Sequence, residues 1–403
     1  MTRSGARLGL LATHPVQYQV PWYRALANTP GVDLTVFYCM LPDAHQQGTG
    51  FGVDFRWDVP MLEGYSHRVL PNVARSPALG RFGGCNTPAI RGVLQANTFD
   101  AFIISGWGVR SYLQALWACR RAGVPVILRG ESNGLKPRPW YIRLVHRMLL
   151  SQCSAMLAIG TANAAFYAQN GVPEERIFHG PYCVDNARFE QIARTLAPER
   201  PMLREGWHIP PGACVFLYCG KFVEKKRPLD LLRAFTLVHR ELPGQTAHLL
   251  MVGDGPLRAE CEQFTREAGL PVSFAGFLNQ AEIPKAYVAS DCLVLPSDYG
   301  ETWGLVVNEA MACGRPAIVS DRVGCHPDLV VPGKTGAVFP FKNTEALADV
   351  LTELTKRPDR RQEMGKTARD LVASFNVDTL LSGTLKALRY VATRPRATVV
   401  ALQ

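Results

Sequence analysis

The cysteine pattern of this chain lacks the features of a metal centre or a disulfide framework. Eleven cysteines occur, but none forms a Cys-x-x-Cys pair or shares a metal-ligand spacing with histidine. Several lie in apolar runs, such as Cys39, Cys219 and Cys292, where a reduced thiol behaves as a small apolar side chain. We therefore expect buried thiols in a protein of the cytoplasm rather than a disulfide-stabilised fold.

The sequence also lacks a long apolar run. The uncharged stretch 148–170 contains serine, glutamine, glycine and asparagine, so it predicts a helix end, a buried strand at 156–159 and a new helix rather than a membrane span. The apolar run 8–12 is too short for the hydrophobic core of a secretory signal. These absences favour a cytoplasmic location.

The size and the charge of the chain limit the number of its domains and the kinds of partner it can bind. A chain of 403 residues normally forms two or three domains, and 47% hydrophobic against 19% charged residues allows a sizeable core. The net charge of +10 favours anionic partners such as nucleotides and phospholipid surfaces. Because the basic residues are scattered rather than gathered on one helix among aromatics, we expect no nucleic-acid partner.

Short apolar runs alternate with helical patterns in both halves of the chain. The runs predict strands at 8–13, 34–38, 101–105, 126–129, 156–159, 215–219, 248–252, 272–275, 292–295, 317–320 and 336–339. This alternation predicts an α/β fold of two Rossmann-like, doubly wound domains facing a cleft. We place the domains at residues 1–195 and 196–375, followed by a helix within 376–403 that crosses back to the first.

Two segments break the alternation. Residues 43–86 are rich in glycine, proline, arginine and aromatics and show weak periodicity, so they predict a long loop region of the kind that often carries binding function. The polar, proline-containing segment 186–211 predicts the boundary between the domains.

The stretch 293–316 is the most informative part of the chain. It predicts a buried strand, a glycine-containing loop and a helix, with Glu301 and Glu309 on either side of seven residues. The N–H groups that begin a helix lack intrahelical acceptors and favour an anion, and Gly304 would let a ligand approach them. Carboxylates beside an anion site suit a sugar nucleotide, although two glutamates at this spacing are also common as solvated helix charges.

A basic loop follows the predicted strand 215–219. Lys221 and Lys226 bracket this loop at the carboxyl edge of the sheet, where open α/β sheets bind ligands. Two ammonium groups at that place can hold a diphosphate. The alternative is that Lys225, Lys226 and Arg227 form a solvated run of charges.

Four motifs of the second half, taken in order, resemble those of the retaining glycosyltransferases of family 4, which have the GT-B fold. They are the basic loop 219–228, the Gly-Asp-Gly-Pro turn 253–256, the run 274–278, and the loop and helix 296–309. The resemblance is close over 215–336 and loose in the first half. Family members often carry Arg at the position of Lys221 and Gly at that of Arg227.

The resemblance implies a role for each motif. Lys221 and Lys226 bind the leaving diphosphate and, with Glu301, form the catalytic set. The donor is bound by residues from all four motifs, namely Gly220, Gly253, Phe277, Thr302, Trp303, Gly304, Leu305 and Glu309. Within that set Glu309 is expected to hold the ribose hydroxyls, and Phe277 either stacks near the base or belongs to the core.

The acceptor side is expected in the first half. Residues 13–18 are Thr-His-Pro-Val-Gln-Tyr, where family members usually carry glycine, and they resemble a subset of family 4 with this pattern. That resemblance turns His14 and Tyr18 toward the acceptor, whereas a lone histidine at a strand end is about as often structural. Trp107, Arg129 and Glu131 follow later strands on the same side, and the last two could instead form a structural ion pair.

The resemblance implies transfer of a sugar, with retention, from a nucleotide-diphosphate sugar to an acceptor hydroxyl. UDP- and GDP-sugars are the expected donors, and the expected acceptor is a glycan or lipid-linked saccharide of cell-surface polysaccharide or glycolipid biosynthesis. No Asp-x-Asp motif occurs, so we expect neither a metal nor a cofactor. The competing functions are a sugar-nucleotide epimerase, an inverting transferase on the same fold, and a non-catalytic sugar-nucleotide-binding protein.

The segment 136–147 combines basic and interfacial aromatic residues. Its helical part places Trp140, Tyr141 and Leu144 near one face, and its basic residues are Lys136, Arg138, Arg143 and Arg147. This pattern suits peripheral contact with an anionic membrane, such as the inner face of the plasma membrane. The alternative is an ordinary helix of the first domain whose apolar stripe packs on the sheet.

Overall fold

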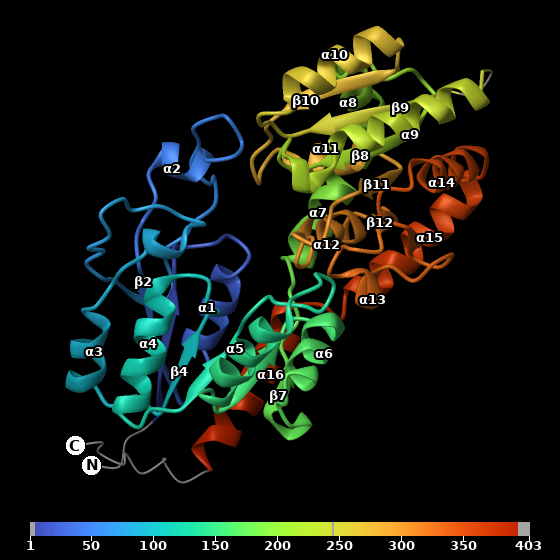
Figure 1. Ribbon diagram of the computed structural model, residues 1–403. Coiled ribbons are helices and arrows are strands. Elements are labelled where there is room, and N and C mark those ends of the chain that lie inside the picture. The colour runs from blue at the N-terminus through green and yellow to red at the C-terminus, as the bar shows by residue number, and fades with distance from the viewer. Residues whose placement is uncertain (1–4, 244–245, 394–403) are drawn as a thin grey trace. The chain divides into compact units, whose positions relative to one another are not determined.

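The computed structural model describes residues 5–243 and 246–393 and divides the chain into two compact units. Unit 1 comprises the chain up to Gln46, Pro60–Tyr182 and the chain from Val377, and unit 2 comprises Gln47–Val59 and Cys183–Asn376. Each unit is built on one parallel sheet with helices on its faces (Figure 1). The predicted pair of Rossmann-like α/β domains is therefore confirmed.

Unit 1 has a seven-stranded sheet in the order β3-β2-β1-β4-β5-β6-β7. Its strands are β1 (Ala6–Ala12), β2 (Val32–Tyr38), β3 (Ser66–Val69), β4 (Ala101–Ile104), β5 (Val126–Leu128), β6 (Ala155–Ala158) and β7 (Ile177–His179). The strand order reverses between β1 and β4, which pair in register from Leu8 with Ala101 to Leu11 with Ile104. The loops that follow these two strands therefore leave the carboxyl edge of the sheet next to each other.

The helices of unit 1 come from both ends of the chain. They are α1 (Val20–Ala27), α3 (Ile90–Ala96), α4 (Arg110–Arg121), α5 (Trp140–Ser151), α6 (Thr161–Gln169) and α16 (Val377–Ala392), with short turns η1 (Phe82–Gly84) and η2 (Glu174–Arg176). Helix α16 is the last of these in the chain but lies against α1, β6 and β7 (Figure 1). Its Thr384 accepts a hydrogen bond from the indole of Trp22 on α1 at 3.2 Å.

Unit 2 has a six-stranded sheet in the order β10-β9-β8-β11-β12-β13. Its strands are β8 (Cys214–Cys219), β9 (Ala247–Val252), β10 (Val272–Gly276), β11 (Cys292–Leu295), β12 (Ala317–Ser320) and β13 (Gly336–Phe339). Every residue of β8, β9, β11 and β12 is buried, which accounts for their continuous apolar sequences. The order reverses between β8 and β11, so the switch point of this sheet lies there.

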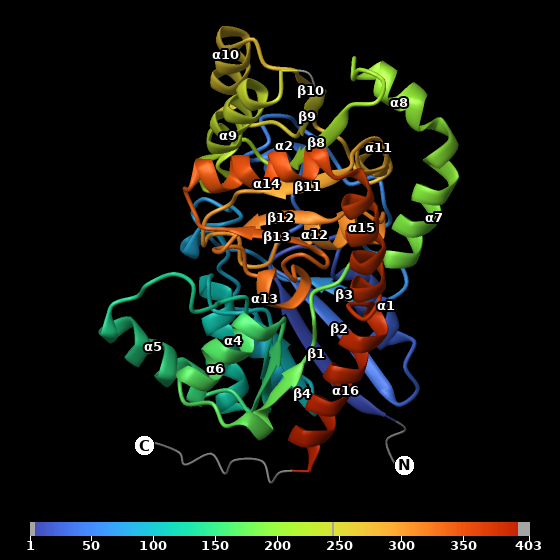
Figure 2. The ribbon, with the colours of Figure 1, turned by 90° about the vertical axis from the view of Figure 1, so that its right-hand side faces the viewer.

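Helices cover both faces of the second sheet. They are α7 (Asn186–Leu196), η3 (Ala197–Glu199), α8 (Arg200–Gly206), η4 (Glu224–Lys226), α9 (Pro228–Glu241), α10 (Arg258–Ala268), α11 (Ile283–Ala289), α12 (Leu305–Ala312), α13 (His326–Leu329), α14 (Thr344–Lys356) and α15 (Pro358–Val372). Helix α9 contacts α10 and α14, whereas α12 contacts α7 and α15 (Figure 2). This arrangement leaves the loops at the carboxyl edge of the sheet to form a site.

Two segments differ from the sequence-based expectation. The predicted loop 43–86 contains helix α2 (Ala44–Gly48) and strand β3, and its residues 47–59 belong to unit 2. The predicted boundary segment 186–211 contains α7, η3 and α8, and unit 2 begins earlier, at Cys183. The reason is that α7 packs on α11 and α12 of unit 2, a tertiary contact that local composition does not encode.

Two further observations concern the cysteines and the length of the helices. All eleven cysteines are buried, and none of them is part of a disulfide. Within the described ranges, no helix is both long and apolar enough to cross a membrane.

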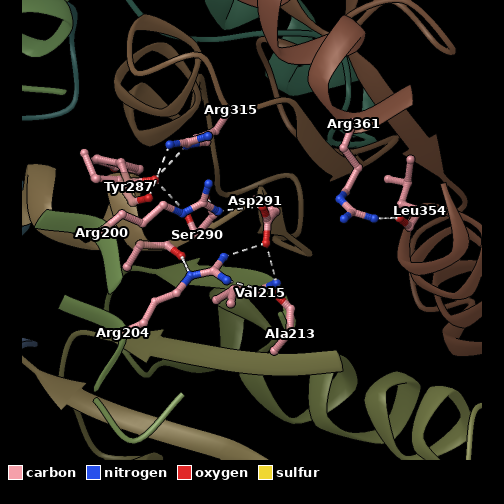
Figure 3. A network of polar contacts seen from close by, with 12 residues as sticks. Arg200, Arg204, Ala213, Val215, Tyr287, Ser290, Asp291, Arg315, Leu354 and Arg361 are labelled. Carbon is pink, nitrogen blue, oxygen red and sulfur yellow. Dashed lines mark hydrogen bonds and ion pairs between the residues drawn. The ribbon is translucent and has the colours of Figure 1, made fainter. Parts of the chain in front are cut away.

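A cluster of arginines around Asp291 stabilises the amino edge of the second sheet. Arg200 and Arg204 form ion pairs with its two carboxylate oxygens at 2.6 and 2.9 Å, and the N–H of Val215 donates to Oδ2 at 2.8 Å (Figure 3). Arg204 also donates to the carbonyl of Ala289, the last residue of α11. The cluster thus neutralises a helix C-terminus as well as a carboxylate, which is a structural role for these cations.

Candidate functional site

The candidate donor site lies in unit 2, where the loops after β8 and β11 leave the sheet together. The two strands pair directly, with Cys292 opposite Phe216 and Leu293 opposite Leu217. A backbone hydrogen bond of 2.8 Å from Asp298 to the carbonyl of Lys225 joins the loops beyond the strands. Two of the four predicted motifs therefore meet at the switch point of the sheet, where open α/β folds bind ligands.

This meeting brings Lys226 and Glu301 into an ion pair between Nζ and Oε2. Their side chains are 13% and 15% exposed, so the pair is shielded from water but still accessible from one side. Gly220 begins the loop, and an added Cβ there would lie 3.6 Å from Cε of Lys226. The structure thus places two of the three predicted catalytic residues in contact.

Lys221 lies in the same loop and faces segment 47–59. Its ammonium donates to the carbonyl of Thr49 at 2.8 Å and lies 4.4 Å from the centre of the Phe51 ring. Burial, followed by the nearby charges of Lys225 and Lys226, lowers the pKa of Lys221. Lys221 is thus a partly desolvated cation near other positive charges, and an anion bound beside it would relieve both effects.

The Gly-Asp-Gly turn after β9 packs against the basic loop. Gly253 has φ +124° and an added Cβ would lie 2.0 Å from the carbonyl oxygen of Gly220, so no other residue fits. Asp254 accepts from the N–H of Gly255 and from Arg258, both at 2.7 Å, and so closes the turn. Gly253 therefore fixes the spacing between the two loops.

Phe277 follows β10 and is half-buried. Its ring centre lies 5.0 Å from that of Phe51 and 4.3 Å from that of Phe55. Phe277 thus stands at the carboxyl edge of the sheet beside segment 47–59, and it is not among the buried residues of the main hydrophobic cluster of unit 2.

Gly304 precedes α12 for a reason that the sequence did not reveal. It has φ +102°, and an added Cβ would lie 2.9 Å from Leu295 and 3.3 Å from Val323. Backbone conformation and packing therefore both favour glycine at this position, and the approach of a ligand to the helix start stays a prediction. Thr302 and Leu305, before and after Gly304, are half-buried. Helix α12 begins at Leu305, so its first N–H groups lie at the carboxyl edge of the sheet.

Two other predicted donor residues are buried. The Trp303 side chain is in the interior, and its indole N–H donates to Asn308 at 2.8 Å, so its ring does not line the site. Glu309 is only 1% exposed and accepts a hydrogen bond from the Tyr287 hydroxyl at 2.6 Å. Tyr287 comes from α11, and no motif in the sequence marks it as the partner of Glu309.

Arg227 closes the basic loop and directly precedes α9. Its φ is +53°, a left-handed conformation that glycine adopts without cost. The guanidinium donates twice to Asp230, at 2.7 and 3.0 Å, which holds the start of α9. The interpretation of Arg227 as a solvated charge is therefore wrong, whereas Lys225 is exposed as that interpretation expects.

In unit 1, His14 follows β1 and Trp107 follows β4, so both lie at the carboxyl edge at the switch point. The Nδ1 atom of His14 lies 2.9 Å from the Thr13 hydroxyl, and burial lowers the pKa of His14 to about 4. His14 is therefore neutral at physiological pH. Tyr18 is half-buried between β1 and α1, and Trp107 packs against His146 and Phe166, with ring centres 5.5 and 6.3 Å away.

Arg129 and Glu131 are connected through a tyrosine. The buried guanidinium of Arg129 lies between the rings of Trp22 and Tyr182, 5.1 and 4.6 Å from their centres. The Tyr182 hydroxyl donates to the carboxylate of the exposed Glu131. The structure therefore links the two residues through Tyr182, by stacking on its ring and by a hydrogen bond from its hydroxyl.

The family model of "Glycosyl transferases group 1" matches residues 199–371, which include all four motifs of the candidate donor site. A D-inositol 3-phosphate glycosyltransferase of Rhodococcus erythropolis is 30% identical over 303 residues, which span 69% of this chain and 66% of that relative. The sulfoquinovosyl transferase SQD2 of Arabidopsis thaliana is 37% identical over 171 residues, which span 41% of this chain and 31% of that relative. The chain thus matches less than two thirds of the length of these relatives.

Solved structures resemble nearly the whole chain. Anabaena Alr3699/HepE in complex with UDP and glucose superposes with a TM-score of 0.70, at 17% identity over 95% of this chain and 99% of that one. A glycosyltransferase from Rickettsia africae has a TM-score of 0.74, at 15% identity over 97% and 100%. At such identities the likeness shows the fold alone. The chain therefore has the GT-B fold of two Rossmann-like domains, and its residues 199–371 are a glycosyl transferases group 1 domain.

Proposed function

We propose that this protein is a retaining glycosyltransferase that moves a sugar from a nucleotide-diphosphate sugar to an acceptor hydroxyl. The observation that carries the proposal is the position of Lys226 and Glu301, which are paired at the switch point of a sheet inside the glycosyl transferases group 1 domain. UDP is bound in the Anabaena structure, and a mycobacterial relative is named GDP-mannose-dependent, which supports UDP- and GDP-sugars as donors.

The proposed mechanism relies on charge that is in place before the reaction. The leaving diphosphate lies between Lys221, Lys226 and the first N–H groups of α12, which together stabilise the negative charge as the glycosidic bond breaks. Glu301 holds the Lys226 ammonium at the loop. The acceptor hydroxyl attacks the anomeric carbon from the side of the leaving group and gives its proton to the leaving phosphate, which retains the anomeric configuration.

The acceptor is proposed to be a glycan or lipid-linked saccharide bound beside the carboxyl edge of unit 1. His14, Tyr18, Trp107, Arg129 and Glu131 all come from loops near that edge. Because His14 is neutral at pH 7, it can serve as a hydrogen-bond donor or acceptor for a sugar hydroxyl without adding charge.

Donor turnover without acceptor separates the proposed function from a non-catalytic sugar-nucleotide-binding protein. A transferase hydrolyses its donor slowly and releases the nucleoside diphosphate, whereas a binding protein leaves the donor intact. Analysis of the product then distinguishes the enzymes: an epimerase returns an intact isomeric nucleotide sugar, and an inverting transferase gives the opposite anomer.

Glu309→Gln is expected to weaken donor binding about tenfold while the melting temperature stays close to that of the wild type. The substitution keeps the shape and the hydrogen bond from Tyr287 but removes the charge proposed to hold the ribose hydroxyls. Titration with UDP and GDP measures the loss of affinity. Tyr287→Phe is the matched control, since it removes one hydrogen-bond donor to Glu309 and keeps the carboxylate. Unchanged affinity with a collapsed melting temperature would show that Glu309 is structural.

Activity is expected to persist in EDTA. The diphosphate charge is proposed to be neutralised by ammonium groups and a helix N-terminus, and the sequence has no Asp-x-Asp motif to hold a metal-bound diphosphate. The assay is the initial rate of transfer with and without chelator. Loss of activity that Mn²⁺ or Mg²⁺ restores would contradict this phosphate-binding chemistry.

Helix α5 of unit 1 presents an apolar stripe to solvent. Trp140, Tyr141, Leu144, Val145 and Met148 are 71, 54, 53, 44 and 55% exposed. The buried residues of this helix are His146 and Leu150, on its opposite side. The interpretation of α5 as a helix that packs this stripe on the sheet is therefore wrong, and the exposed stripe supports a proposed peripheral contact with an anionic membrane.

Arg143→Ser with Arg147→Ser is expected to weaken binding to anionic vesicles about thirtyfold, since each basic residue near such a surface contributes on the order of 1 kcal/mol. Both arginines are exposed beside the stripe, whereas Arg138 donates to the carbonyl of Asn133 at 2.6 Å and is left unchanged. Arg120→Ser with Arg121→Ser on α4 removes the same charge elsewhere and is the control. Equal sedimentation with neutral and anionic vesicles at low salt would refute the membrane contact.

A further inference from the structure

Segment 47–59 lies on the same groups of unit 2 that the proposed function assigns to the donor. The Lys221 ammonium, proposed to bind the diphosphate, donates to the carbonyl of Thr49 at 2.8 Å and faces the Phe51 ring at 4.4 Å. A carbonyl oxygen and the negative face of an aromatic ring are both groups that stabilise a cation. The segment therefore gives Lys221 interactions that a diphosphate oxygen would have to replace.

The other end of the proposed donor site is also covered by this segment. Phe51 and Phe55 contact Phe277 with ring centres 5.0 and 4.3 Å away. Aromatic pairs in contact prefer centre separations of about 4.5–7 Å, so rings as close as Phe55 and Phe277 leave no room for a nucleobase between them. The rings thus occupy the face of Phe277 on which a base would stack.

The sequence of the segment suits this placement. Gly50 and Gly52 have φ +85° and +74°, in the left-handed region that favours glycine. An added Cβ on Gly50 would lie 3.2 Å from the Lys221 nitrogen, and one on Gly52 would lie 3.7 Å from Asp254, so the backbone passes close to the donor-site loops. The segment is not held by a single contact, because each residue from Thr49 to Gly52 lies close to a residue of unit 2.

Two hydrogen bonds hold the second half of the segment. The amide of Asn279 donates to the carbonyl of Arg56 at 2.7 Å, and the N–H of Ala281 donates to the Asp58 carboxylate at 3.0 Å. Asn279 and Ala281 follow Phe277 closely in the chain, so these hydrogen bonds lie near the base end of the proposed site. Contacts thus run continuously from the proposed diphosphate end to the base end.

We propose that segment 47–59 is a built-in competitor of the nucleotide sugar, an inference that rests on the proposed function. To bind, the nucleotide sugar must displace Thr49 and Phe51 from Lys221, and the rings of Phe51 and Phe55 from Phe277. The residues on both sides of the segment belong to unit 1, so a displaced segment remains attached and can return. If the segment covers the site nine tenths of the time, the apparent donor Kd is about tenfold higher than the intrinsic value.

The test compares the binding of UDP, GDP and ADP by calorimetry to the wild type and to Phe51→Ala with Phe55→Ala. The control is Phe82→Ala, an exposed phenylalanine of unit 1. We expect the double variant to bind its preferred nucleotide about tenfold more tightly than the other two proteins. An unchanged or higher Kd would overturn the competition while leaving the proposed function intact, and absence of nucleotide binding to all three proteins would overturn both.

Because Phe55 is buried, the double variant could fold poorly. Hydrogen exchange on the wild-type chain therefore provides a second test that needs no substitution. Amide hydrogen exchange of residues 47–59 is followed with and without saturating nucleotide. Displacement predicts faster exchange in this segment and slower exchange in the loops 220–227 and 296–304. Slower exchange in 47–59 would show that the segment closes over the nucleotide, and would overturn the competition.

Discussion

Lys226→Ala is expected to lower turnover by about a hundredfold or more, the scale of losing one preorganised charge at a developing anion. The Lys226 ammonium is held at the switch point by Glu301, and its side chain is only 13% exposed, so bulk water replaces it poorly. The loss should appear in kcat, because negative charge on the leaving phosphate is greatest as the glycosidic bond breaks.

Lys225→Ala is the matched control for this effect. Lys225 is the neighbouring residue and carries the same charge, but it is exposed and its backbone carbonyl, rather than its side chain, joins the two loops. We expect Lys225→Ala to keep turnover within a few fold of the wild type. If Lys226→Ala folds normally and retains near wild-type turnover, Lys226 has no place in the mechanism.

Asp291→Ala is expected to lower the free energy of unfolding by about 3 kcal/mol, the scale for removing one partner of a largely buried ion pair. Asp291 is 17% exposed and neutralises Arg200 and Arg204, and it also accepts the N–H of Val215 at the start of β8. Denaturant unfolding measures the loss. Asp33→Ala, which removes an exposed ion pair with Arg7, should cost about 1 kcal/mol or less. If Asp291→Ala and Asp33→Ala lower the free energy of unfolding equally, the arginine cluster stabilises the fold no more than an exposed ion pair does.

The contribution of Asp291 should depend on pH in a defined direction. Burial raises its pKa, but Arg200, the N–H of Val215 and Arg204 outweigh burial, and the pKa is lowered below its ordinary value of 3.8. A carboxylate with a depressed pKa stabilises the fold fully above that ordinary value and loses this contribution as pH falls through its folded-state pKa. The difference in unfolding free energy between the wild type and Asp291→Asn should therefore shrink below about pH 4.

Local patterns in the sequence predict the elements on which the site is built. Strands such as β11 and β12 have the predicted bounds, because proline and the apolar runs themselves mark their ends directly. The alternation of strands and helices predicts a parallel sheet in each half, with ligands bound at the carboxyl ends of the strands. The strand order, and with it the contact between the loops after β8 and β11, comes from the structure.

Features that depend on tertiary contacts could not be predicted in this way. Residues 47–59 show no periodicity, and only the fold reveals that Phe51 and Phe55 meet Phe277. Helix α5 is apolar on two sides, so its pattern alone does not show which stripe packs on the sheet. Similarly, the burial of Glu309 against Tyr287 joins residues of α11 and α12 that no spacing rule connects.

The central claim is that unit 2 binds a nucleoside diphosphate through its basic loop, and thermal unfolding with UDP, GDP and ADP tests it most directly. A ligand that binds only the folded state stabilises it by RT ln(1 + [L]/Kd). We predict that at least one of the three nucleotides raises the melting temperature of the wild type and of Lys225→Ala, and that the increase is largely lost in Lys226→Ala. No increase at millimolar concentration, or an equal increase in all three proteins, would contradict the claim.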